Sequence, residues 1–171
     1  MRNLEIKSPV ENAASIRASI ERLPATFKGV LIQRDTYFEV PHGRLKLREI
    51  DGQQAELIAY VRGEEGKERV SDFEIHRLDD PASLITVLTK TLGVRAVVEK
   101  RRELFMFGDT RIHLDDVKGL GSYLEFEIPY IEGGEAHANQ ILAFLKEKLV
   151  LDASDFINGS YIDLLLAGSK G

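Results

Sequence analysis

The sequence predicts an α+β fold in which an eight-stranded antiparallel β-barrel encloses a tunnel, with helices packed on its outside. Two observations carry this prediction. Segments in which polar and apolar residues alternate recur along the chain, mostly separated by turn signals, which is typical of strands joined in hairpins. Three longer segments instead carry apolar residues at helical spacing. Because the helices would cover the apolar sides of the strands, the charged sides are expected to face one another inside the barrel.

The chain begins with a predicted strand over residues 3–7. Side chains alternate between the two faces of a strand, so Asn3, Glu5 and Lys7 share one face. A carboxylate and an ammonium group therefore lie side by side at the start of the chain. A helix is predicted over residues 10–23, where the apolar residues recur at helical spacing.

Four more strands are predicted before the second helix. The second of them sets Arg44, Lys46 and Arg48 on one face, which makes it a strongly basic strand. Asp51-Gly52 is a hairpin turn signal that separates this strand from the next. The four predicted ranges are 29–40, 43–48, 55–62 and 69–75.

The second half of the chain repeats the mixture of helices and strands. Asp80 and Pro81 are typical of a helix start, and Gly93 is a plausible terminator for that helix. Three strands then follow, and the last of them aligns Glu125 and Glu127 on one face. The predicted strands are 94–107, 111–117 and 123–128, followed by a helix over 135–150 and a short helix or turn at 160–165.

Bulk properties limit the class of protein. A length of 171 residues suits one domain, 1–171, and a content of 43% hydrophobic and 30% charged residues is ordinary for a globular protein. The net charge of −5 does not favour nucleic-acid binding. The chain has no cysteine, which excludes disulfides and thiol catalysis and agrees with a cytoplasmic location. No apolar run is long enough to span a membrane, so no membrane partner is expected.

The predicted tunnel interior is rich in charge. Converging cations repel one another unless a polyanion lies among them, and arginine and lysine are the side chains that bind phosphate oxygens. A cluster of carboxylates on a neighbouring wall suits a hard divalent cation such as Mg²⁺ or Mn²⁺. Together these features indicate a metal-bound polyphosphate. The cations are Lys7, Arg44, Lys46, Arg48, Arg62, Lys100, Arg102 and Arg111, and the anions are Glu5, Glu56, Asp115, Glu125 and Glu127.

Several short motifs also occur in a distinctive order across nearly the whole chain. They are Glu5-Ile6-Lys7, Asp35-Thr36-Tyr37-Phe38, Arg44-Leu45-Lys46-Leu47-Arg48, Lys100-Arg101-Arg102, Leu114-Asp115, Gly119-Leu120-Gly121, Leu124-Glu125-Phe126-Glu127 and Ser160-Tyr161-Ile162-Asp163-Leu164-Leu165. In this order and spacing the chain resembles the CYTH superfamily, also called triphosphate tunnel metalloenzymes. That superfamily includes class IV adenylate cyclases and thiamine triphosphatases.

The resemblance implies roles for individual residues. Lys7, Lys46, Arg48, Lys100, Arg102 and Arg111 would bind phosphate oxygens, with Arg44 and Arg62 as further candidates from the tunnel inventory. The resemblance also implies a divalent metal, Mg²⁺ or Mn²⁺, held directly or through water by Glu5, Asp115, Glu125 and Glu127. Lys7 and Tyr37 are the candidate catalytic residues. The expected partner is a small-molecule triphosphate, and a homodimer is left open.

Two departures from the family pattern bear on the chemistry. Asn3 stands where the family has its first glutamate, which removes one anionic oxygen from the expected metal site. Thiamine triphosphatases carry a lysine on the fourth strand that pairs with the tyrosine matching Tyr37, and the strand over 55–62 has no lysine. Arg62 is a poor base because it stays protonated. This second departure argues against thiamine triphosphatase activity.

Two reactions and one alternative therefore remain open from the sequence. In a triphosphatase, water attacks the terminal phosphorus; in a cyclase, the ribose 3′-hydroxyl attacks the α-phosphorus. The alternative is a non-catalytic sensor of a polyphosphate or nucleotide, which the loss of the first glutamate keeps in view. Two side chains have alternative roles as well: His113 could contact phosphate or be structural, and Tyr37 could orient substrate, although packing in the barrel is the more common role of such a tyrosine.

Overall fold

The fold is described from a computed structural model, for residues 2–62, 71–157 and 159–168, without the side chains of Arg62, Ser71 and Asp72. Its centre is one antiparallel sheet of eight strands in the order β1-β8-β7-β6-β2-β3-β4-β5. The strands are β1 (Arg2–Pro9), β2 (Thr26–Phe38), β3 (Arg44–Ile50), β4 (Gln54–Arg62), β5 (Ser71–Leu78), β6 (Val94–Phe107), β7 (Thr110–Val117) and β8 (Gly121–Tyr130). The predicted α+β class and the eight antiparallel strands are confirmed.

The helices occur where the sequence predicted them. They are α1 (Ala13–Glu21), α2 (Pro81–Leu92), α3 (Glu135–Leu149) and α4 (Tyr161–Gly168), with a short 3₁₀ helix at Ala153–Asp155. The Asp80 side chain accepts a hydrogen bond from the backbone N–H of Ala82 and so caps α2 at its start. Among the described residues, none of the helices is long and apolar enough to cross a membrane.

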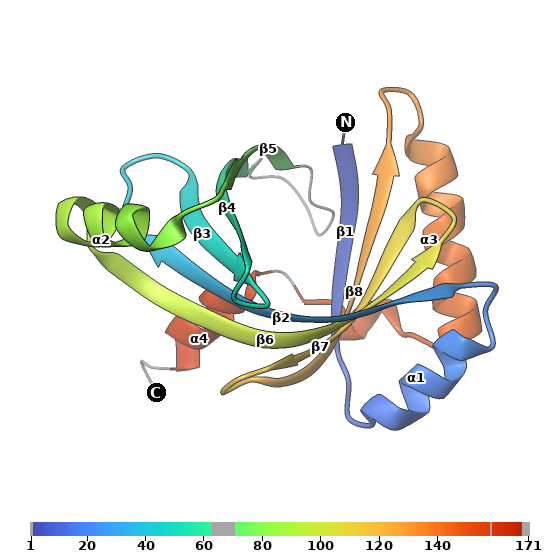
Figure 1. The fold of residues 1–171 in the computed structure, drawn as a ribbon. Coiled ribbons are helices and arrows are strands. Elements are labelled where there is room, and N and C mark those ends of the chain that lie inside the picture. Colours follow the sequence, from blue (N-terminus) through green and yellow to red (C-terminus); the bar gives the residue numbers. More distant parts are fainter. Residues whose placement is uncertain (1, 63–70, 158, 169–171) are drawn as a thin grey trace.

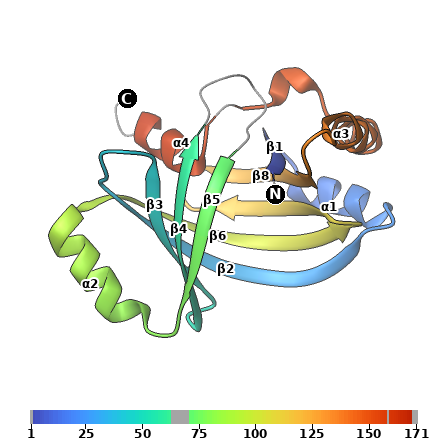
Figure 2. The same cartoon turned by 90° about the horizontal axis from the view of Figure 1, so that it is seen from above.

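The sheet curls into a half-barrel because β2 and β6 are long enough to belong to both of its halves. These two strands are 13 and 14 residues long and pair along nearly their whole length. One half contains β1, β8 and β7, and the other contains β3, β4 and β5 (Figures 1 and 2). The edges of the sheet are β1 and β5, so the ladder of hydrogen bonds ends there rather than closing a ring.

The convex face of the sheet is apolar and is covered by three helices. Under α1 and α3 lie buried residues from four strands, including Ile6, Phe105, Ile112 and Phe126. At the other end of the sheet, α2 covers a smaller core that contains Leu47 (Figure 1). Because side chains alternate along each strand, burying these residues directs their charged neighbours to the concave face.

The segment predicted as a short helix or turn forms α4, which packs on the concave face, unlike the three longer helices. Its Tyr161 and Ile162 form a core with Val98 and Val117, which share the inner face of β6 and β7 with the charged residues. The inner face of these strands therefore changes from charged to apolar at one end. The apolar end accepts the helix, and α4 covers that part of the concave side.

Candidate functional site

The concave face encloses a cavity of about 410 Å³, within the size range of small-molecule sites. Most of the predicted interior charges line it, together with apolar residues that the sequence analysis did not place there. The charged and hydroxyl-bearing lining residues are Glu5, Lys7, Tyr37, Lys46, Arg48, Glu56, Tyr60, Arg77, Lys100, Arg102, Arg111, His113, Glu125, Glu127, Ser160 and Tyr161.

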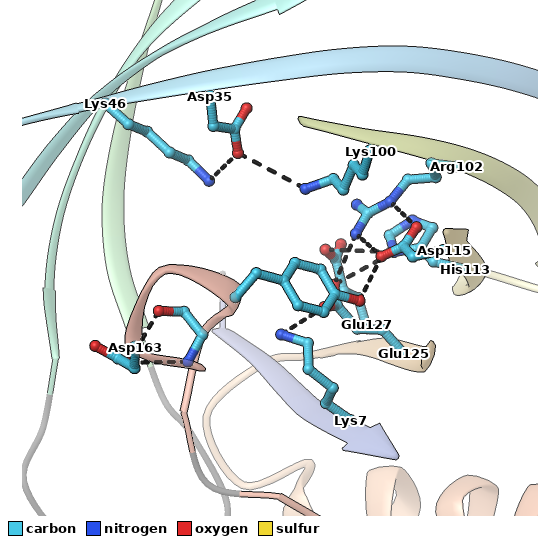
Figure 3. A network of polar contacts seen from close by, with 12 residues as sticks. Lys7, Asp35, Lys46, Lys100, Arg102, His113, Asp115, Glu125, Glu127 and Asp163 are labelled. Atoms are coloured by element: carbon cyan, nitrogen blue, oxygen red, sulfur yellow. Dashed lines mark hydrogen bonds and ion pairs between the residues drawn. The ribbon is translucent and has the colours of Figure 1, made fainter. Parts of the chain in front are cut away.

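One part of the cavity, here called the cationic end, consists of Lys46, Arg48 and Lys100, which line it, and of the carboxylate of Asp35, which is buried behind them. Arg48 donates two hydrogen bonds to the Asp35 carboxylate, at 2.8 and 2.7 Å. The Nζ atoms of Lys46 and Lys100 lie 3.1 and 3.7 Å from Asp35 Oδ2 (Figure 3). Three cations thus surround one carboxylate, and the cluster keeps a formal excess of two positive charges.

Protonation at the cationic end follows from this crowding. Asp35 is 1% exposed, and burial alone would raise its pKa, but Arg48, Lys46 and Lys100 hold the pKa well below its usual range. Burial and the neighbouring Arg102 lower the pKa of Lys100, although Asp35 opposes that shift. An anion placed among these cations would stabilise the charged form of Lys100.

The opposite part of the cavity, here called the carboxylate end, consists of Glu5, His113, Glu125 and Glu127. Sheet register produces it, because Glu5 lies opposite Glu127 and His113 lies opposite Glu125 on neighbouring strands. Lys7 Nζ lies 3.0 Å from Glu125, and Arg111 Nε donates to Glu127 at 2.7 Å. Figure 3 shows Lys7, His113 and the two β8 carboxylates converging.

The groups at the carboxylate end differ in the direction in which their pKa values are shifted. Burial, together with Glu125 and Glu127, raises the pKa of Glu5 to about 7. Burial and Arg102 lower the pKa of His113, so the imidazole is neutral at neutral pH. Burial would raise the pKa of Glu125, but Lys7 and Arg102 hold it well below its usual range. A neutral imidazole and several carboxylates are groups that bind a divalent cation.

Ligand atoms of His113, Glu125 and Glu127 all lie within 4.8 Å of one another, which is close enough to share one metal ion. Glu5 stands beside them, and its raised pKa reflects the same repulsion between carboxylates. The oxygen-rich donor set suits Mg²⁺ or Mn²⁺, and the imidazole favours Mn²⁺. The residues present therefore fit the expected divalent cation.

Asp115, expected as a metal ligand, has both carboxylate oxygens engaged by protein donors. Arg102 donates one hydrogen bond to each oxygen at 2.7 Å, and the Tyr161 hydroxyl donates to Oδ2 at 2.6 Å. Asp115 is 1% exposed and is not among the residues that line the cavity. In this arrangement Asp115 orients Arg102, whose guanidinium also reaches Glu125 at 3.4 Å.

Arg44 is likewise engaged at the end of the chain rather than in the cavity. Its guanidinium donates to the Ser160 hydroxyl at 2.7 Å and to the Asp163 carboxylate at 2.6 Å. The ion pair joins β3 to the start of α4, next to Tyr161. Arg44 therefore helps to hold α4 on the concave face. The Arg62 side chain lies outside the described residues, so its predicted role stays a prediction.

The candidate catalytic residues both lie on the cavity wall. Lys46 Nζ is 3.4 Å from the Tyr37 hydroxyl, so a lysine does approach this tyrosine, from β3 rather than from the fourth strand. Burial and Asp35 raise the pKa of Tyr37 to about 12, so the phenol stays protonated and can donate a hydrogen bond. Lys7 lies 4.1 Å from the centre of the Tyr161 ring while paired with Glu125.

Several contributors to the site were not predicted from the sequence, among them Asp35, Gln33 and Tyr161. Asp35 belongs to one of the sequence motifs, and alternation along β2 puts it on the same face as Tyr37, which is the signal that indicates its position. Gln33 precedes it on that face, so the same signal indicates its position. Tyr161 carried no periodicity signal, because its place depends on where α4 packs.

Comparisons with known proteins agree with this architecture. The family model of the CYTH domain matches residues 1–161. No curated protein sequence matches this chain. The PH1012 protein of Pyrococcus horikoshii OT3 is 25% identical, with a TM-score of 0.86 over 95% of this chain and 98% of that one.

Two further solved structures share the fold at lower identity. A candidate adenylate cyclase from Vibrio parahaemolyticus is 22% identical, with a TM-score of 0.82 over 97% of this chain and 98% of that one. A candidate adenylyl cyclase from Hippeastrum, described as having a dominant triphosphatase activity, is 15% identical, with a TM-score of 0.68 over 97% and 96% of the two chains. With the family model spanning nearly all of its length, the chain belongs to the CYTH domain family.

Proposed function

We propose that this protein is a divalent-metal-dependent enzyme that binds a nucleoside or other organic triphosphate in its cavity and cleaves a phosphorus–oxygen bond. The observation that carries the proposal is the sorting of charge within one cavity. The cationic end has an excess of positive charge, and the carboxylate end has clustered carboxylates of which one has a raised pKa. A polyphosphate bound to a metal ion would satisfy both ends at once.

The comparisons support the same class of reaction. The Vibrio parahaemolyticus protein is named as a candidate adenylate cyclase, and the Hippeastrum protein is described as mainly a triphosphatase. Both reactions begin from a triphosphate, and they differ in which phosphorus is attacked. A triphosphatase releases orthophosphate after attack by water, whereas a cyclase releases pyrophosphate after attack by the ribose 3′-hydroxyl.

In the proposed complex the side chains mainly position the substrate. Arg48, Lys46 and Lys100 would bind phosphate oxygens and neutralise their charge, with Arg102 between the two ends of the cavity. Glu125, Glu127 and Glu5, with His113, would hold Mg²⁺ or Mn²⁺. When bound, that ion supplies charge stabilisation for the reacting phosphoryl group. Tyr37 would donate a hydrogen bond from its protonated hydroxyl.

A second candidate is a sensor that binds a triphosphate without turnover. One observation favours it: Asn3, at the position of the family's first glutamate, lines the cavity and is 6% exposed. A carboxamide there adds no negative charge beside Glu5. A weaker metal site would leave binding by the cationic end intact while reducing catalysis.

One assay separates these possibilities. The protein is incubated with ATP, thiamine triphosphate or inorganic triphosphate and with Mg²⁺ or Mn²⁺, and products are followed by phosphate detection and nucleotide chromatography. Orthophosphate release identifies hydrolysis, and pyrophosphate with a cyclic nucleotide identifies cyclisation. Saturable binding without any product identifies the sensor. The enzyme proposal fails if no triphosphate is turned over with either metal.

Variants at the two ends should respond differently. Glu125→Gln and Glu127→Gln are expected to abolish metal-dependent turnover, and Glu127→Gln should weaken Mn²⁺ binding by more than the roughly 10- to 100-fold that follows loss of a residue supporting a metal ligand. Arg48→Ala should mainly weaken substrate binding. The control is Glu147→Gln, which changes an exposed glutamate of α3. Wild-type activity in a cavity variant would remove that residue from the site.

A further inference from the structure

The lining of the cavity is not uniformly charged. Where β2, β3 and β6 meet, it contains an apolar patch made of Leu31, Ile50 and Leu104. More apolar surface continues on β4 and β5, where Ile58 and Ile75 also line the cavity and Ile75 is 48% exposed. Inorganic polyphosphate offers nothing that would pack on such a surface, because it consists entirely of charged groups.

Gln33 stands at the border between this patch and the cationic end. Sheet register places it directly opposite Lys100 on β6 and directly opposite Ile50 on β3. Residues two apart on a strand share a face, so Leu31 lies on one side of Gln33 and Asp35 on the other. Gln33 is therefore the polar residue that separates the expected phosphate position from the apolar patch.

The Gln33 side chain also lacks one hydrogen bond within the described part of the protein. It is 4% exposed, and its Oε1 atom is buried without a hydrogen-bond partner among the residues that the structure describes. An unpaired buried carbonyl costs about 1–3 kcal/mol, so such atoms are rare unless a water molecule or a ligand supplies the missing hydrogen bond. Phosphate oxygens at neutral pH accept hydrogen bonds, and they cannot satisfy a second acceptor.

Resting on the function proposed above, we infer that the site selects an organic triphosphate ester over inorganic triphosphate, with Gln33 as the specificity-determining residue. On binding, the Gln33 amide turns toward the cavity, and its Oε1 atom accepts a hydrogen bond from a hydroxyl or amino group of the ester that lies next to the phosphate chain. The apolar body of the ester packs on Leu31, Ile50 and Leu104. A nucleoside triphosphate has this combination, because ribose hydroxyls lie between its phosphates and its base.

The inference is tested by titration calorimetry on the full chain, with EDTA present so that no metal-dependent turnover consumes the ligand. The ligands are ATP, its 2′-deoxy and 3′-deoxy analogues, and inorganic triphosphate. ATP should bind at least about tenfold more tightly than inorganic triphosphate, and one deoxy analogue should lose about tenfold relative to ATP. This comparison needs no variant, so it does not depend on how a substituted chain folds.

Gln33→Met supplies the second arm, since methionine has a similar length and lacks the acceptor. The preference for ATP over inorganic triphosphate should fall about tenfold, and the variant should no longer distinguish ATP from the sensitive deoxy analogue. Gln140→Met, at an exposed position of α3, is the matched control and should keep both preferences.

The outcomes separate this inference from the function on which it rests. Inorganic triphosphate binding as tightly as ATP would overturn the inference and leave the proposed triphosphate site standing. An unchanged preference in a folded Gln33→Met variant would do the same. If neither ATP nor inorganic triphosphate binds, the inference fails, and the proposed function fails with it if neither is turned over with Mg²⁺ or Mn²⁺.

Discussion

The cationic end and the carboxylate end of the cavity belong to one sheet, yet they shift the pKa of a buried carboxyl group in opposite directions. At the cationic end, three basic side chains keep Asp35 ionised in spite of almost complete burial. At the carboxylate end, burial and two further glutamates raise the pKa of Glu5 to about 7. Burial alone does not decide ionisation, because the sign of the neighbouring charge reverses its effect.

This contrast indicates what each end lacks. The cationic end has more positive charge than Asp35 can balance, and the carboxylate end has a glutamate that is only partly ionised at neutral pH. An anion and a divalent cation would each relieve one end. Three changes test this comparison. They are the removal of the Asp35 carboxylate at the cationic end, the removal of the hydrogen bond from Tyr161 to Asp115, and the titration of Glu5 at the carboxylate end.

The largest effect is expected from Asp35→Asn. The substitution removes the carboxylate that Lys46, Arg48 and Lys100 share, and removing one partner from buried ion pairs costs about 3–5 kcal/mol of stability. Added inorganic triphosphate should recover much of the lost melting temperature by replacing the missing negative charge. Thermal unfolding with and without triphosphate measures both effects.

Asp116→Asn is the control for this experiment, because Asp116 is exposed on β7. It should leave the melting temperature and the response to triphosphate close to those of the wild type. Equal stability of Asp35→Asn and wild type would show that the three cations do not depend on Asp35. A destabilised variant that gains nothing from triphosphate would remove the phosphate role from the cationic end.

A smaller loss is expected from Tyr161→Phe. The variant removes the hydrogen bond from the Tyr161 hydroxyl to Asp115 while Arg102 stays paired with that carboxylate. A hydrogen bond to a charged group contributes about 1.5–3 kcal/mol, so the free energy of unfolding should fall by that amount. Urea unfolding measures it, with Tyr130→Phe on β8 as the matched control. An unchanged midpoint would mean that α4 does not depend on this contact.

The smallest effect is expected from titrating Glu5. Because protons compete with the metal below pH 7, the apparent affinity for Mn²⁺ should fall by about tenfold for each pH unit below the pKa of about 7. Calorimetric titration of Mn²⁺ between pH 5.5 and about 8 tests this. Glu5→Gln should bind Mn²⁺ more weakly at pH 8 and should lose this component of the pH dependence.

The raised pKa of Glu5 also affects stability. Mn²⁺ affinity should rise with pH, whereas the stability of the metal-free protein should fall. Without metal, the native state binds more protons at Glu5 than the unfolded state between pH 4.5, the ordinary pKa of a glutamate, and pH 7. Stability from this group therefore falls as the pH rises through that window. Metal-free Glu5→Gln should then gain stability relative to the wild type as the pH increases. Parallel pH profiles of the two proteins would show that Glu5 has an ordinary pKa.

Much of the fold was predictable because the signal for it is local. The alternation in residues 3–7, the Asp51-Gly52 turn and the Asp80–Gly93 helix boundaries each depend on a few adjacent residues, and all correspond to observed elements. The same alternation placed Lys46, Arg48, Lys100 and Glu125 on the inner face, where the structure has them. Site residues on strands could be predicted because side-chain direction has a period of two.

Other features depended on contacts between distant parts of the chain. Asp115 and Arg44 have the expected strand positions, but Arg102, Tyr161 and Asp163 determine what each one binds. The position of α4 on the concave face was not predictable, because an apolar helix matches either side of a sheet until its partners are known.

The sequence by itself determined the eight strands, the covering helices and which side chains share a face, because these follow from short-range periodicity and turn chemistry. Tertiary structure alone decided which charges became neighbours, since register brings Glu5 to Glu127 and Asp35 to Arg48 across separate strands. It also decided their ionisation, because a buried carboxyl group responds to the charges packed around it and not to its own neighbours in sequence.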